Sequence, residues 1–68
     1  MTFGEYREQN RKLWAELEAK NQAVNDFVDQ NPDLLVDGVY ERFWELQNEA
    51  TLAIGKIQNF QANAQVSR

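Results

Sequence analysis

A single proline at position 32 divides this chain of 68 residues into two stretches of similar length. In the first stretch apolar residues recur at spacings of three and four, the pattern of a helix with one apolar side. They are Phe3, Tyr6, Leu13, Leu17, Val24 and Phe27. Thr2 and Glu5 have the spacing of a capping box, which predicts that this helix begins at residue 3. Because proline disfavours the helical conformation of the residue before it, the helix is expected to end near residue 30.

The second stretch has a stronger helical pattern, in which apolar residues repeat every seven positions. One row is Val36, Phe43, Ala50, Ile57 and Ala64, and its companion row is Val39, Leu46, Ala53 and Phe60. Such a repeat is typical of a helix that packs along another helix. It predicts a second helix over about residues 38–65. The residues before it, 34–38, form either a short helical turn that Pro32 begins and Asn31 caps, or a loop.

Two helices of similar length around one short break predict an antiparallel hairpin. The expected fold class is therefore all-α, a coiled-coil-like hairpin in a single domain, residues 1–68. Its first helix spans about 3–30, its turn about 31–37 and its second helix about 38–65. Folding the chain about residue 34 places Leu17 near Ala50, and Tyr6 near Phe60 or Gln61. Two pairs of opposite charge stand four residues apart in the first helix: Glu8 with Lys12, and Glu16 with Lys20.

A chain this short buries a small core and usually needs a disulfide, a metal or a partner. Cysteine and histidine are absent, which excludes disulfides, thiolate zinc sites and cysteine or histidine chemistry. The first three ligand positions of a calcium-binding loop are matched by Asp29, Asn31 and Asp33. The pattern then fails, because Leu34 and Tyr40 occupy the positions where that loop needs glycine and glutamate. We therefore expect no enzyme, no cofactor, no metal and no small-molecule substrate, and a core that association completes into a helical bundle.

Candidate partner-binding residues lie on the second helix, outside its apolar rows. Trp44 and Leu52 are apolar there, and Gly55 occupies a helix interior, where glycine costs about 1 kcal/mol relative to alanine and often marks a close approach. Phe60 extends the set toward the end of the helix. These residues predict a docking surface for another helix. The alternative is a set of scattered apolar side chains, which are normal on protein surfaces.

Charge is unevenly distributed along the chain. Eleven acids and seven bases give a net charge of −4, which argues against binding nucleic acid through its phosphates. Residues 26–49 hold seven acids and one base, a net charge of −6, whereas residues 50–68 hold only Lys56 and Arg68. In a hairpin this makes the turn end acidic, and the tip acids are Asp33, Asp37, Glu41, Glu45 and Glu49. They are either a solvated end or a surface for a basic partner.

The first residues contain no apolar leader, and no apolar stretch approaches the ~20 residues of a membrane span. We therefore expect a soluble cytoplasmic protein with no membrane contact. The expected function is a small non-catalytic assembly subunit, an adaptor or chaperone-like hairpin. Its partner is itself, as a homodimer or higher oligomer, or a larger complex. The alternative is an acidic inhibitor, for example of viral origin, whose tip mimics the phosphates of a nucleic acid.

Overall fold

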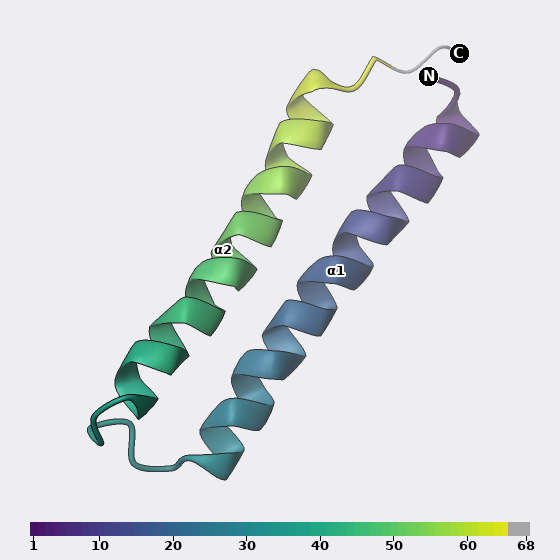
Figure 1. Cartoon of the computed structure of the whole chain (residues 1–68). Helices are drawn as coiled ribbons and strands as arrows, with labels where there is room; N and C mark the ends of the chain where they lie inside the picture. The colour runs from purple at the N-terminus through teal and green to yellow at the C-terminus, as the bar shows by residue number, and fades with distance from the viewer. Residues whose placement is uncertain (66–68) are drawn as a thin grey trace.

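The computed structural model describes residues 1–65 and shows two helices that lie side by side and run in opposite directions (Figure 1). Helix α1 (Phe3–Gln30) and helix α2 (Val39–Asn63) are joined by a short connection at one end of the molecule. At the other end, the amino group of Met1 donates a hydrogen bond to the carbonyl of Gln65 (2.9 Å). The predicted all-α hairpin is confirmed. Arg68, one of the two bases in the last segment, lies outside the described residues.

The first helix begins and ends at side chains that satisfy its free backbone groups. The backbone N–H of Glu5 donates to Thr2 Oγ1 (3.1 Å), and that of Thr2 donates to Glu5 Oε1 (3.3 Å), which confirms the capping box. At the far end, the backbone N–H of Asn31 donates to the carbonyl of Phe27 (2.9 Å), and its side-chain amide donates there too (3.0 Å). Asn31 therefore closes α1 instead of starting a new helix.

The connection between the helices is a loop of turns and contains no helical segment. Asp33 Oδ1 accepts a hydrogen bond from the backbone N–H of Leu35 (3.0 Å), which shapes the first turn. Gly38 then adopts a φ of 86° and directly precedes Val39, where α2 begins without a side-chain cap. The loop alternative for residues 34–38 is thus the correct one. The helical-turn alternative fails because the chain must reverse within a few residues, and a positive φ at Gly38 achieves this.

Large side chains of α1 pack against small ones of α2 in the core. Among the described residues the buried side chains are Leu17, Leu46, Ala50, Ala53 and Ile57. Leu17 clusters with Ala53, which lies less than one helical turn beyond its predicted neighbour Ala50, and with Ile57, which lies about one turn farther. Tyr6 stacks on Phe60 as predicted, with ring centroids 5.1 Å apart. Alanines opposite leucine allow the two helix axes to approach closely.

The hairpin is a rod with little interior. Its Cα atoms extend 53 × 17 × 9 Å, and its radius of gyration is 15.8 Å, whereas a compact chain of this length has one of about 11 Å. The accessible surface is 5309 Å². A compact protein of 8.0 kDa exposes about 4,500 Å². The isolated hairpin thus leaves on the order of 800 Å² more surface in water than a compact monomer does.

Replacing Gly38 with alanine should destabilise the hairpin, because a Cβ atom is strained at this positive φ even though no other atom lies within 4 Å of it. We expect a loss of roughly 1–3 kcal/mol in the free energy of unfolding. Urea unfolding followed by circular dichroism at one protein concentration measures it. Gly4→Ala is the matched control, since a Cβ there meets only Thr2 Oγ1 at 3.9 Å. An equal effect of both substitutions would contradict the role of the Gly38 backbone.

Candidate partner-binding surface

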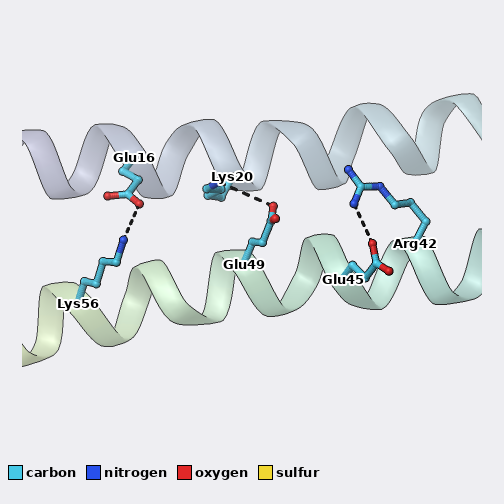
Figure 2. Close-up of polar contacts among 6 residues, drawn as sticks. All are labelled: Glu16, Lys20, Arg42, Glu45, Glu49 and Lys56. Atoms are coloured by element: carbon cyan, nitrogen blue, oxygen red, sulfur yellow. Dashed lines mark hydrogen bonds and ion pairs between the residues drawn. The ribbon is translucent and has the colours of Figure 1, made fainter.

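One side of the hairpin is crossed by two ion pairs that connect the helices (Figure 2). Lys56 Nζ lies 3.0 Å from Glu16 Oε1, and Lys20 Nζ lies 3.7 Å from Glu49 Oε2. Glu16 and Lys20 are therefore used between helices, whereas the sequence predicted that they pair within α1. Because all four side chains are partly exposed, each pair contributes at most about 1 kcal/mol. Their main effect is to select the register in which opposite charges meet.

The charged residues of α2 all lie toward this side of the helix. With 3.6 residues per turn, one longitudinal half of α2 contains every acid and base between Val39 and Asn63. They are Glu41, Arg42, Glu45, Glu49 and Lys56. We call the side with the interhelical ion pairs the charged side. The opposite side of α2 is uncharged from Tyr40 onward and carries Tyr40, Gln47, Thr51, Ile54 and Gln58.

The matching side of α1 is uncharged only next to the helix contact, because Arg7 and Glu18 lie on the same side farther from α2. Five residues of α1 lie next to the helix contact on the same side of the hairpin as the uncharged residues of α2, as the helical repeat and the antiparallel direction of the helices show. They are Phe3, Asn10, Trp14, Asn21 and Val28. A hydrogen bond from Gln61 Nε2 to Asn10 Oδ1 (3.3 Å) joins the helices on this side. Together these residues of α1 and α2 form what we call the uncharged side. Trp14 and Ile54 lie near its middle and keep 46% and 42% of their surface exposed.

Trp44 and Gly55, two of the predicted partner-binding residues, lie on the outer side of α2, which faces away from α1. Trp44 is half exposed and makes edge-to-face contacts with Tyr40 and Phe43, with ring centroids 6.1 Å and 5.8 Å apart. A Cβ atom on Gly55 would meet no atom within 4 Å. The hairpin itself therefore gives no reason for a glycine at this position, and its role in docking stays a prediction.

The other two predicted partner-binding residues lie elsewhere. Leu52 is 68% exposed and, by the helical repeat, lies between the outer side and the charged side of α2. Phe60 is half-buried because its ring stacks on Tyr6 within the hairpin. The four residues therefore do not form one patch. Sequence reasoning missed Trp14 and Ile54 as surface residues. The available signal was the helical repeat of each segment combined with the antiparallel direction of the two helices.

The acids of the tip are exposed, and the chain itself neutralises some of them. Glu45 Oε2 lies 2.9 Å from Arg42 Nη1, and Glu49 pairs with Lys20. These two pairs offset the repulsion between glutamates spaced four residues apart. The carboxylate of Asp33 accepts a hydrogen bond from the backbone N–H of Leu35 within the turn. The side chain of Leu35 itself is 88% exposed. Recognition of a basic partner by this tip stays a prediction.

An open hollow of about 630 Å³ lies at the start of α1, and its lining comes from the first turns of this one helix. It is lined by Phe3, Gly4, Tyr6, Arg7, Glu8, Asn10 and Arg11. A hydrogen bond from the Arg11 guanidinium (2.7 Å), together with its positive charge, holds the pKa of the Glu8 carboxyl below its usual value. Both side chains are exposed, so the hollow is a shallow surface feature between side chains.

Reversing the charge of Lys56 should destabilise the hairpin, because a glutamate there faces Glu16. Lys56→Glu is expected to lower the free energy of unfolding by about 1 kcal/mol or less. The double variant Glu16→Lys/Lys56→Glu should recover most of the loss. Urea unfolding at low and high salt measures both effects, and the differences should shrink at high salt because exposed charges are screened. A double variant no more stable than the single one would contradict the pairing.

Gly55→Leu should weaken association and leave the helicity of the hairpin intact, if the outer side of α2 is a contact. Leucine fits the open space at this position and is the better helix former by about 1 kcal/mol. Sedimentation measures assembly, and circular dichroism on the same sample measures helicity. Ala19→Leu, at an exposed position of α1, is the size-matched control. An assembly state that Gly55→Leu leaves unchanged would remove this residue from the contact.

No helix within residues 1–65 has the length and apolar character needed to cross a lipid bilayer. Comparisons of the chain with models of protein families, with curated proteins and with solved structures gave no match. Its function is therefore inferred from the arrangement of side chains on the hairpin.

Proposed function

We propose that this protein is a small non-catalytic subunit that acts through protein–protein association, either with itself or by docking onto a larger complex. The observation that carries the proposal is the exposed area of the hairpin. Its surface of 5309 Å² exceeds that of a compact protein of its mass by on the order of 800 Å². One partner in a stable protein interface buries about the same area.

The chemical character of the exposed surface supports the same conclusion. Nine large apolar side chains in residues 1–65 are exposed: Met1, Phe3, Trp14, Leu35, Val36, Tyr40, Trp44, Leu52 and Ile54. Four of them are aromatic, and aromatic residues are enriched at protein interfaces relative to other surfaces. Burying part of this set would add to a core of five side chains and would stabilise the hairpin by removing apolar area from water.

The acidic-inhibitor alternative depends on the tip acids, and the structure gives it less support. Glu45 and Glu49 are engaged in ion pairs within the chain, which leaves Asp33, Asp37 and Glu41 to present charge to a partner. Changing these three acids to their amides separates the two functions. An assembly subunit keeps its association after the change, whereas a phosphate mimic loses its binding to a basic target.

The proposal is tested by measuring molar mass and helicity of the isolated chain over about a hundredfold dilution. If association completes the core, dilution should lower both the mass and the midpoint of thermal unfolding, because binding stabilises the folded state by mass action. A poorly helical monomer also fits, since it needs a different partner in order to fold. A fully helical monomer whose melting midpoint is independent of concentration would overturn the proposal.

A further inference from the structure

We infer that the partner is a second copy of this chain, bound through the uncharged side, and that the two hairpins run antiparallel in a four-helix bundle with their turns at opposite ends. This inference rests on the proposed function and names the partner of that association. It also selects the uncharged side over the outer side of α2 that the sequence pointed to.

The two broad sides of the hairpin differ in what burial would cost. Burying the charged side would remove the pairs Glu16–Lys56 and Lys20–Glu49 from water, and the desolvation of ion pairs can exceed the attraction between them. On the uncharged side α2 presents no acid or base along its whole length, and Trp14 and Ile54 lie near the middle with their apolar surface exposed. Burial of the residues next to the helix contact is therefore favourable, with Arg7 and Glu18 of α1 at the edge of the interface.

The area of this side is sufficient for a stable dimer. The Cα atoms of the hairpin span 53 × 17 Å in the plane that contains both helices. This footprint is about 900 Å², close to the ~800 Å² that each partner buries in a stable interface. It also matches the excess surface that the isolated hairpin exposes. One contact across one broad side would thus bring the exposed area to that of a compact protein.

The chemistry of the uncharged side fits a copy of itself. In a symmetric dimer the same patch contributes to both halves of the interface, so it must be self-complementary. Side-chain amides both donate and accept hydrogen bonds, so Asn21 and Gln47 can pair with amides of a second copy. Aromatic rings such as Trp14 and Tyr40 can likewise pack on their own kind. A strongly charged patch would instead repel its copy.

The charge distribution along the hairpin determines the direction. Residues 26–49, at the turn end, carry seven acids and one base, whereas residues 1–25 carry four of each. A parallel dimer would bring two ends of charge −6 together. An antiparallel dimer instead places the acidic half of each hairpin beside the half of its copy that contains residues 1–25, which carries four acids and four bases. Trp14 and Ile54 lie within one turn of the helix centres, so each would approach its own symmetry mate.

The choice of side is tested by placing one glutamate on each side and measuring dimerisation by sedimentation. Ile54→Glu should weaken the dimer more than tenfold, because the new charge is buried twice in a symmetric interface. Leu52→Glu is the matched control: it lies two residues away, is more exposed, and should leave dimerisation unchanged. Gln47→Glu, nearly the same shape as the native residue, should weaken the dimer without affecting the packing of the hairpin.

The results separate this inference from the proposed function. A dimer that Leu52→Glu dissociates and Ile54→Glu does not would overturn the choice of side. A wild-type chain that stays a poorly helical monomer would overturn the inference and leave the proposed function standing, with a different partner. A fully helical monomer at every concentration would overturn both.

The direction is tested with spin labels, because the chain contains no cysteine and single cysteines can be introduced cleanly. In Leu35→Cys the label lies at the turn, and in Thr51→Cys it lies near the middle of α2 on the uncharged side. Pulsed electron paramagnetic resonance on the dimer should give a short distance for residue 51. The distance for residue 35 should approach the 53 Å length of the hairpin. Short distances at both positions would show a parallel dimer and overturn the antiparallel arrangement.

Discussion

The packing of leucine on α1 against alanine on α2 is the contact on which the hairpin depends. Ala50 and Ala53 are the most deeply buried residues of the structure, and Leu17 and Ile57 pack around them. Small residues on one helix let the other approach, and that approach brings the flanking side chains into reach. The Tyr6–Phe60 stack near the chain ends and the ion pairs beside the core both follow from this spacing.

Close packing of only two helices also creates the main physical problem of this molecule. Each helix buries one narrow stripe, and the rest of its circumference faces water. The two broad sides of the hairpin differ in the polar contacts that join the helices. The interhelical ion pairs lie on one side, and the hydrogen bond between Asn10 and Gln61 lies on the other. A side held by ion pairs is stable in water, whereas the exposed apolar area of Trp14 and Ile54 on the other side favours burial, provided that the amides beside it find hydrogen-bond partners.

Much of the fold could be predicted from the sequence because its signals are local. The capping box at Thr2 and the break before Pro32 set the ends of α1, and both act within a few residues. The partner-binding residues were harder to predict. Phe60 looked available from the pattern of α2 alone, but Tyr6, 54 positions earlier in the chain, covers it. Gly55 suggested a close approach, yet nothing in the hairpin comes near it.

The sequence by itself determined two helices, their limits and the antiparallel reversal, since helical periodicity, capping and proline act over short distances. Only the tertiary structure decided that Glu16 and Lys20 pair with the opposite helix and that the loop closes through the positive φ of Gly38. These features depend on the rotation and register of one helix against the other. Packing between side chains that are distant in sequence determines the rotation and the register, and no local sequence pattern predicts them.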